Sequence, residues 1–263
     1  MATISVVVAI RDEEAMLPGC LSRLSFADEV VVVIDDRTSD SSPEIARSAG
    51  ARVTFERFVN FGQFKNAGLS AATGDWVFVV DADERVSRAL SNAIVGSLDG
   101  PHDAFRVKMA NYFHGTLMLA GGWQERPLRL WRRGWAQYPG GIHERPNFGT
   151  RSPKVGQLEP PLAHFSHRSI VDNLRKSANY VEMQANEQLP GSRKVTPRRL
   201  YWTVIREVLF RLVWRSGWRD GVPGIAEAIY WPVSHMAAEV RLWELQQSPS
   251  IEEKYRQLEE TTR

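Results

Sequence analysis

Cysteine is almost absent from this chain: among its 263 residues there is one, Cys20. A disulfide needs two cysteines, so no disulfide framework is possible within the chain, and a zinc site built from cysteines is not expected. The hydrophobic fraction of 43% is nonetheless that of a globular protein with a sizeable core, which excludes a disordered or collagen-like chain. This cysteine usage fits a reducing compartment.

Long apolar runs and an excess of one charge are lacking as well. No uninterrupted apolar run reaches the roughly 18 residues of a membrane span, because Arg206, Glu207 and Arg211 interrupt the longest candidate, residues 200–214. The chain opens directly into an apolar run, Ile4–Ile10, so we expect no cleaved signal peptide. Its 33 lysines and arginines nearly balance 31 acidic residues, and we therefore expect no nucleic-acid partner.

Two glycine-rich phosphate-binding motifs are also missing. No Gly-x-Gly-x-x-Gly follows the first apolar run, which argues against a dinucleotide dehydrogenase, and no Gly-x-x-x-x-Gly-Lys-Ser/Thr loop is present, which excludes a P-loop NTPase. A bound phosphate would therefore be neutralised by a metal ion and by cationic side chains.

What is present in the first 100 residues is an alternation of strand and helix patterns. Short β-branched runs, most of them almost continuously apolar, are typical of strands buried on both faces of a parallel sheet. Stretches with helical spacing of apolar residues lie between them. We therefore expect a doubly wound α/β domain. The expected strands are residues 4–10, 30–34, 52–55 and 76–80, and the expected helices are residues 13–24, 41–49 and 64–72.

Beyond residue 100 the pattern changes. Residues 105–165 mix short strand-like pieces with glycine and proline breakers, and residues 168–189 have a helical pattern. After a Pro-Gly-Ser break the chain reads as mostly helical and is rich in arginine and tryptophan. The expected domains are residues 1–190, divided into halves 1–100 and 101–190, and a helical extension over residues 191–263.

Carboxylates stand at the ends of two expected strands. Asp35 and Asp36 end the second strand, and the sequence Asp81-Ala82-Asp83-Glu84 follows the fourth. Ligands of open parallel sheets bind beyond the carboxyl ends of the strands. Paired carboxylates there suit Mg²⁺ or Mn²⁺ bridging to phosphate oxygens. The alternative is that each aspartate only caps a helix or shapes a turn, but two pairs at one edge favour the metal site.

Several motifs together resemble a known enzyme family. The first four segments resemble the nucleotide-binding half of family 2 inverting glycosyltransferases, which have the GT-A fold and use a nucleotide-sugar donor with a metal at an Asp-x-Asp motif. Later segments resemble the subgroup that includes lipopolysaccharide inner-core β-1,4-glucosyltransferases, and the similarity extends to about residue 245. The first segments are Ser5–Glu14, Val33–Asp40, Gln63–Gly68 and Gly74–Glu84; the later ones are Asn111–Gly115, Gly121–Trp123, Arg129–Gly134 and Gly141–Glu144.

The resemblance implies a GT-A type, doubly wound, mostly parallel α/β sheet. Its Rossmann-like half, residues 1–100, would bind the nucleotide sugar, residues 101–190 would face the acceptor, and the helical, Arg/Trp-rich extension would follow. The nucleotide-sugar-binding residues that it implies are Ala9, Arg11, Glu13, Asp35, Asp36, Lys65, Asp81, Ala82 and Asp83.

The family also implies individual roles on the donor side. Asp35 or Asp36 would hydrogen-bond the uracil, and Lys65 would contact the base or the diphosphate. Of the Asp-x-Asp pair, Asp83 is the expected direct metal ligand and Asp81 would lie nearer the ribose.

A late histidine is the expected third protein ligand of the metal. His164 takes this place, and imidazole suits Mn²⁺; the alternative is a hydrogen-bonded core histidine. Two positions depart from the family pattern. Asp12 stands where asparagine is usual, and Arg37 stands where a small residue is usual and would contact phosphate or face solvent.

Inverting transfer needs a base on the acceptor hydroxyl. The Glu-Asp pair that supplies it in most of the family is missing, and His143-Glu144 occurs after the Arg-Arg element instead. We expect Glu144 to be the base and His143 to orient it or touch phosphate. The alternative is that both cap a strand and that Glu144 pairs with Arg145; Glu125 is then the next candidate for the base.

Aromatic and cationic residues raise two further questions. His114, Trp123 and Trp131 are candidates for an acceptor-sugar pocket and equally for the core. Residues 193–219 hold eight arginines and lysines against Glu207 alone, among many aromatic and aliphatic residues. This pattern is typical of a helix in an anionic membrane interface, and also of a helix packed on its own domain with arginines facing water.

The sequence as a whole predicts a UDP-sugar glycosyltransferase that needs Mn²⁺ or Mg²⁺, with glucose as the sugar by resemblance. The acceptor would be a glycan or lipid-linked glycan of the cell envelope. We expect a cytoplasmic protein, either free or peripheral on the inner face of the membrane. The alternatives are a nucleotidyltransferase of similar fold and a catalytically inactive GT-A scaffold protein.

Overall fold

The contacts within the chain divide it into two compact units. A computed structural model describes residues 1–140 and 145–262. Unit 1 comprises Met1–Tyr112 and Gln124–Ser166, and unit 2 comprises Phe113–Trp123 and His167–Arg263. Helix α5 (Ile170–Gln188), which the expected division at residue 190 places with the first domain, packs along helix α7 (Gly221–Leu245) and is grouped by its contacts with unit 2.

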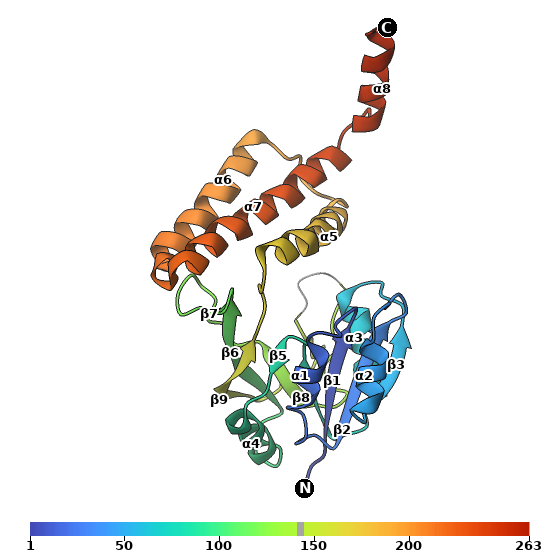
Figure 1. Cartoon of the computed structure of the whole chain (residues 1–263), viewed down its shortest axis with the longest axis vertical. Helices are drawn as coiled ribbons and strands as arrows, with labels where there is room; N and C mark the ends of the chain where they lie inside the picture. Colours follow the sequence, from blue (N-terminus) through green and yellow to red (C-terminus); the bar gives the residue numbers. More distant parts are fainter. Residues whose placement is uncertain (141–144, 263) are drawn as a thin grey trace. The chain divides into compact units, whose positions relative to one another are not determined.

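Four parallel strands form the first half of the sheet in unit 1. They lie in the order β3-β2-β1-β4, so that β1 pairs with both β2 and β4. Figure 1 labels β1, β2 and β3 of this group. Valine and isoleucine fill the interior strands, and their side chains are buried on both faces, as expected for a parallel sheet. The predicted strands are thereby confirmed. Their bounds are β1 Ile4–Ile10, β2 Glu29–Asp35, β3 Arg52–Glu56 and β4 Trp76–Val80.

The second half of the sheet has mixed strand directions. β8 (Leu128–Arg132) joins β4 in antiparallel fashion, and β6 (Ala104–Phe113), β9 (Val155–His164) and β5 (Glu84–Arg85) follow in that order. β6 and β9 are ten residues long, whereas the sequence suggested only short pieces. Their burial alternates along much of their length, because one face packs on the core and the other is more exposed.

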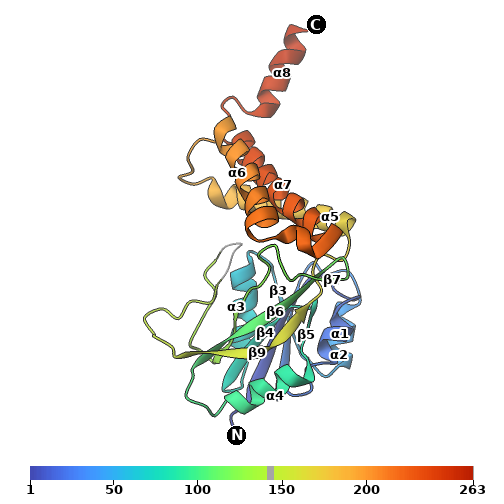
Figure 2. The ribbon, with the colours of Figure 1, turned by 90° about the vertical axis from the view of Figure 1, so that its left-hand side faces the viewer.

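Helices cover both faces of this sheet. Helices α1 (Leu17–Leu21), α2 (Ser42–Ser48) and α4 (Arg88–Ser97) contribute to the hydrophobic core on one face, and α3 (Phe61–Ala71) packs on the other. Figure 2 shows α3 on one side of the strands and α1 and α2 on the opposite side. The doubly wound α/β fold predicted from the sequence is therefore confirmed.

Unit 2 is helical, as expected for the extension. Helix α7 packs against α5 and α6 (Pro197–Leu209), and Figure 1 shows α6 and α7 side by side. Among the described residues, no helix is both long and apolar enough to cross a bilayer. The remaining elements are β7 Thr116–Leu117, the π-helical turn η1 Phe210–Trp214, the 3₁₀ turn η2 Gly217–Asp220 and helix α8 Ile251–Thr261.

Candidate active site

The loops after β1 and β2 are fastened to each other at the carboxyl edge of the sheet. The backbone N–H of Ser39 donates to the Asp12 carboxylate at 2.8 Å, and Asp12 itself has a left-handed backbone with a φ of 51°. The N–H of Glu13 donates to the Ser42 hydroxyl at 3.0 Å. These bonds link residues that are 27 and 29 positions apart. They hold in place the loop that carries Arg11 and Glu13.

Asp35 ends β2 and is buried, with 1% of its surface exposed. Arg37 binds it through two guanidinium contacts, at 3.0 and 2.7 Å, and Arg11 lies 3.8 Å away. Burial alone would raise the pKa of Asp35, but the hydrogen bonds from Arg37 outweigh it and hold the pKa below its usual value. Arg37 therefore bonds a carboxylate in this structure, and the exposed Asp36 beside it is the more open of the two candidates for the uracil contact.

The Asp-x-Asp motif forms a tight turn directly after β4. The N–H of Glu84 donates to the Asp81 carbonyl at 3.0 Å, and the Glu84 carboxylate accepts from the Asp81 N–H at 2.9 Å. Arg129, on β8, contacts the Asp81 carboxylate at 3.2 Å and also donates to Glu84. Two buried side chains, the Glu84 carboxyl group and the Arg129 guanidinium, thus hold the turn in place.

These neighbours shift the two carboxyl groups in opposite directions. For Asp81, burial is outweighed by Lys65 and Arg129, and the pKa lies well below its ordinary value. For Glu84, burial and the neighbouring charge of Asp81 outweigh Arg129 and raise the pKa to about 7. Asp81 is therefore a carboxylate at neutral pH, while Glu84 is close to its titration point.

Lys65 lies on helix α3 and reaches the Asp-x-Asp turn from the face of the sheet that α3 covers. Its ammonium nitrogen lies 3.4 Å from the Asp81 carboxylate, and its side chain is 18% exposed. Asn60 begins helix α3 by accepting the N–H of Gln63 at 2.8 Å. Gly68 allows this helix to lie against the sheet, since a Cβ there would be 2.4 Å from a methyl group of Val7. The close approach of α3 therefore brings a cation to the Asp-x-Asp motif.

His164 stands beside Asp83 at the end of β9. Its Nε2 lies 3.4 Å from the Asp83 carboxylate, and its Nδ1 lies 2.7 Å from the side-chain oxygen of Asn111. An amide oxygen only accepts, so Nδ1 carries the proton and Nε2 faces Asp83. Burial acts to lower the pKa of His164, but the contact with Asp83 and the nearby carboxylates raise it above its usual value.

We tested whether these residues fit a divalent metal. Within residues 1–140 and 145–262, no group of three His, Cys, Asp or Glu side chains is arranged to hold one. A carboxylate oxygen of Asp83 and Nε2 of His164 lie 3.4 Å apart, and the tautomer of His164 is fixed by Asn111. A two-ligand protein set suits Mn²⁺ or Mg²⁺ when water and phosphate oxygens supply the remaining ligands. The donor set fits, with Asp81 turned toward Lys65 and Arg129.

The expected base lies outside the described residues. His143 and Glu144 both belong to the segment 141–144, so the structure places neither of them. The segment before it is anchored to helix α3, because Asn66 donates to the carbonyl of Tyr138 at 2.8 Å and accepts its N–H at 2.9 Å. The second candidate, Glu125, belongs to unit 1 and is exposed, and its carbonyl accepts the N–H of Met109 at 3.0 Å.

The three acceptor candidates prove to be interior residues or bonded ones. Trp131 is fully buried in unit 1, and Trp123 is 9% exposed in unit 2. His114 lies 3.2 Å from the buried carboxylate of Glu227 within unit 2. The two tryptophans are therefore core residues, which removes them as stacking platforms for a sugar.

Sequence reasoning missed three residues that shape this site: Arg129, Glu84 and Asn111. Arg129 and Glu84 lie within motifs that carried the family resemblance, but no local pattern shows that they pair across 45 positions. Asn111 orients His164 across 53 positions.

Comparisons with known sequences show which protein family the chain resembles. The model of the family described as "Glycosyl transferase family 2" matches residues 5–148 of the chain. The lipopolysaccharide core biosynthesis glycosyltransferase LpsC of Rhizobium meliloti is 28% identical over 239 residues, covering 86% of each chain. A TPR repeat-containing protein of Synechococcus elongatus is 34% identical over 102 residues, and this match spans 38% of the chain but only 25% of that protein.

A solved structure shares the fold. The mannosyltransferase PcManGT from Pyrobaculum calidifontis, determined in complex with GDP-Man and Mn²⁺, superimposes with a TM-score of 0.53. It is 13% identical, and the match covers 94% of this chain and 88% of that one. At this identity the likeness concerns the fold.

Proposed function

Because the chain belongs to glycosyltransferase family 2 and has the GT-A fold, we propose that it transfers glucose from UDP-glucose to a glycan of the cell envelope. The acceptor proposed is lipopolysaccharide core or a lipid-linked glycan, a choice supported by the name of the rhizobial relative. Family membership also sets aside the nucleotidyltransferase alternative.

The observation that carries the proposal is the cluster at the carboxyl edge of the sheet. Asp81, Asp83 and His164 lie beside the cations Lys65 and Arg129. A nucleoside diphosphate has its negative charge in its phosphates, so acids alone would repel it. Acids that hold a divalent cation beside the partly buried Lys65 can accept a nucleoside diphosphate, and this combination supports a nucleotide-sugar site.

In the proposed donor complex, Asp36 or Asp35 hydrogen-bonds the uracil and Lys65 contacts the diphosphate. Arg11, Glu13, Ala9 and Ala82 line the pocket. Asp83 and His164 would hold Mn²⁺ or Mg²⁺, with Asp81 close to the ribose; when bound, the metal neutralises charge on the diphosphate leaving group.

The proposed chemistry is a single displacement. An acceptor oxygen attacks the anomeric carbon, the bond from that carbon to the diphosphate oxygen breaks, and UDP leaves with the bonding electrons. Glu144 accepts the acceptor's hydroxyl proton, and His143 orients Glu144. One displacement inverts the anomeric configuration. The reaction is placed in the cytoplasm, and a lipid-linked acceptor would bring the enzyme to the inner face of the membrane.

Nucleotide release from a panel of donors tests this function. The chain is incubated with UDP-glucose, UDP-galactose, UDP-N-acetylglucosamine and GDP-mannose, each with Mn²⁺ or with EDTA. We expect UDP release from UDP-glucose with Mn²⁺ and little release with EDTA. Release of GDP alone would contradict the donor assignment, and UDP binding without any release, with or without acceptor glycan, would support the inactive scaffold instead.

A further inference from the structure

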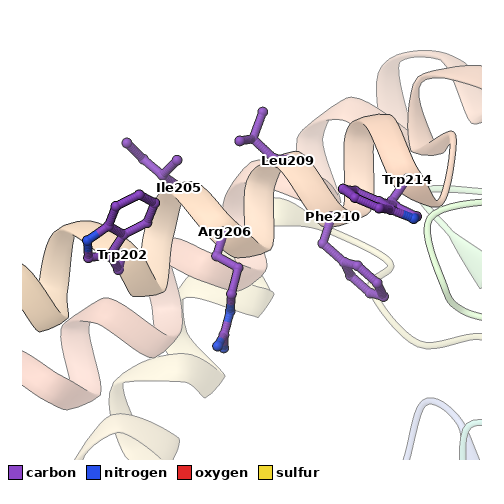
Figure 3. Close-up of a pocket in the computed structure, with 6 residues that line it drawn as sticks. All are labelled: Trp202, Ile205, Arg206, Leu209, Phe210 and Trp214. Carbon is purple, nitrogen blue, oxygen red and sulfur yellow. The ribbon is translucent and has the colours of Figure 1, made fainter.

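An apolar stripe lies exposed along one stretch of unit 2. Besides Tyr201, five large apolar side chains on α6 and η1 have between 38% and 83% of their surface exposed. Trp202, Leu209 and Val213 recur at helical spacing, so they lie along one face of the helix. A hollow of about 330 Å³ lies along this stretch, with Trp202 at one end and Trp214 at the other (Figure 3). The stripe consists of Trp202, Leu209, Val213, Phe210 and Trp214.

The stripe is not the face that holds unit 2 together. Another face of α6 and η1 makes the internal contacts: Arg199 binds Glu239 at 2.7 Å, and Arg211 lies over the ring of Trp123 at 4.5 Å. Leu200 packs against the small core around Leu242. Trp202, Leu209, Val213 and Trp214 each keep more than half of their surface exposed, so these side chains are not used up in the contacts within unit 2.

Exposed cations accompany the stripe. Arg206 lies on it, with 75% of its side chain exposed, and Arg198 and Arg215 are exposed near its two ends. The acid on this stretch, Glu207, lies 3.4 Å from Arg206 and 3.9 Å from Arg211, so its charge is already compensated. An apolar face bordered by net positive charge complements an anionic surface with an apolar interior.

We propose that the stripe binds the surface of an anionic lipid membrane, with Trp202 and Trp214 inserted at headgroup depth and the arginines contacting lipid phosphates. Indole rings favour this boundary because one part is apolar and the N–H is polar. The inference rests on the proposed function in one respect: it names the surface by which the enzyme would meet a membrane-borne acceptor.

Co-sedimentation with vesicles tests the proposal. The full chain is mixed with phosphatidylglycerol/phosphatidylcholine vesicles and with phosphatidylcholine vesicles, at 50 and 500 mM salt. We expect binding to the anionic vesicles that weakens at high salt. Arg198→Gln with Arg206→Gln should weaken binding roughly 30-fold, which corresponds to about 1 kcal/mol for each cation. Trp202→Ser with Trp214→Ser should weaken binding at both salt concentrations.

Matched control variants show whether the position of the arginines and aromatic residues matters, or only the net charge and aromatic content of the chain. Arg23→Gln with Arg88→Gln removes the same two charges from exposed positions of unit 1, and Trp243→Ser with Tyr255→Ser removes exposed aromatics elsewhere in unit 2. Both controls should bind like the wild type, and thermal melting should show that all variants are folded. Equal losses in stripe and control variants, or no wild-type binding, would overturn the proposal.

Two further readouts distinguish other outcomes. UDP-glucose hydrolysis in detergent-free buffer should be unchanged in the stripe variants. A wild type that binds vesicles but never releases UDP would contradict the proposed function, while the proposal that the stripe binds membranes would still hold. Sedimentation velocity without lipid should show a monomer. A dimer that the stripe variants abolish would assign the stripe to a second copy of the chain and overturn the membrane proposal.

Discussion

Two buried side chains, Arg129 and Glu84, hold the Asp-x-Asp turn in place. Arg129 contacts both Asp81 and Glu84, and Glu84 also accepts the N–H of Asp81. A buried charge that loses its partner is costly. At the scale of single residues, Arg129 and Glu84 therefore keep Asp81 in its place in the turn.

Glu84 makes the stability of the protein depend on pH. Its pKa is about 7 in the folded chain, against a usual value of 4.5. Between these values the folded state binds an extra proton, so the free energy of unfolding falls as pH rises through this window. Glu84→Gln keeps an oxygen for Arg129 and removes the titration. From pH 5 to 7.5, metal-free wild type should lose up to about 3 kcal/mol relative to this variant.

Denaturant unfolding at several pH values measures this difference. Glu44→Gln is the control, because Glu44 lies exposed on α2, and its pH curve should run parallel to the wild type. Parallel curves for Glu84→Gln and wild type would mean that Glu84 titrates normally in the fold.

Glu144 should govern turnover rather than donor binding. Glu144→Gln removes the proposed base, so turnover should fall roughly 10²–10⁴-fold. UDP affinity should stay within a factor of two, because the base faces the acceptor. Steady-state rates and UDP titration measure the two effects, with Glu125→Gln as the matched control. If Glu125→Gln loses turnover and Glu144→Gln does not, the assignment of the base is wrong.

The sequence predicted the residue types of this site better than their partners. Asp81, Asp83 and Lys65 stand in local motifs, and the structure brings Lys65 to Asp81 and His164 to Asp83. Pairs that join distant segments, such as Arg129 with Glu84, leave no local pattern. They follow from strand order, which side-chain spacing alone does not determine.

At the scale of elements, the seating of α3 on the sheet sets where Lys65 lies. Gly68→Ala places a Cβ 2.4 Å from Val7 and 2.8 Å from Val33, both on interior strands. Overpacking of this kind costs about 1–3 kcal/mol, and moving α3 should also weaken UDP binding. The same substitution at Gly96, in α4, meets nothing within 4 Å. It should stabilise the fold by up to about 1 kcal/mol, because alanine favours helix more than glycine.

Thermal melting of the two variants measures the contrast. The melting temperature should fall for Gly68→Ala and stay level or rise for Gly96→Ala. Equal shifts would show that the close contact of α3 with β1 and β2 is not a constraint on the fold.

Elements were predictable where one physical signal dominated. The interior strands β1, β2 and β4 are continuous apolar runs, and their bounds match the prediction closely. Helix α1 is far shorter than residues 13–24: the N–H groups of Glu13 and Glu14 donate to side chains of the segment 39–42, residues 14–16 form a turn, and the helix itself covers only Leu17–Leu21. β9 was hidden by Pro160 and Pro161, which usually argue against a strand interior.

At the scale of the whole molecule, the chain combines an α/β unit with a helical one. The expected boundary at residue 190 follows a Pro-Gly-Ser break, whereas contacts group α5 with α7. Within the helical unit, Arg199 and Arg211 are bonded or stacked on internal partners, while Arg198 and Arg206 are exposed. The sequence does not distinguish these four arginines, because the partners of Arg199 and Arg211 lie 40 and 90 positions away.

At the carboxyl edge of the sheet, a nucleotide should bind through a divalent metal. Calorimetric titration of UDP into wild type and Asp83→Ala, with Mn²⁺ and with EDTA, tests it most directly. We predict binding by the wild type in Mn²⁺, at least tenfold weaker binding in EDTA, and the same loss for Asp83→Ala in Mn²⁺ with an unchanged circular dichroism spectrum. Full affinity of Asp83→Ala in Mn²⁺, or of the wild type in EDTA, would contradict the account.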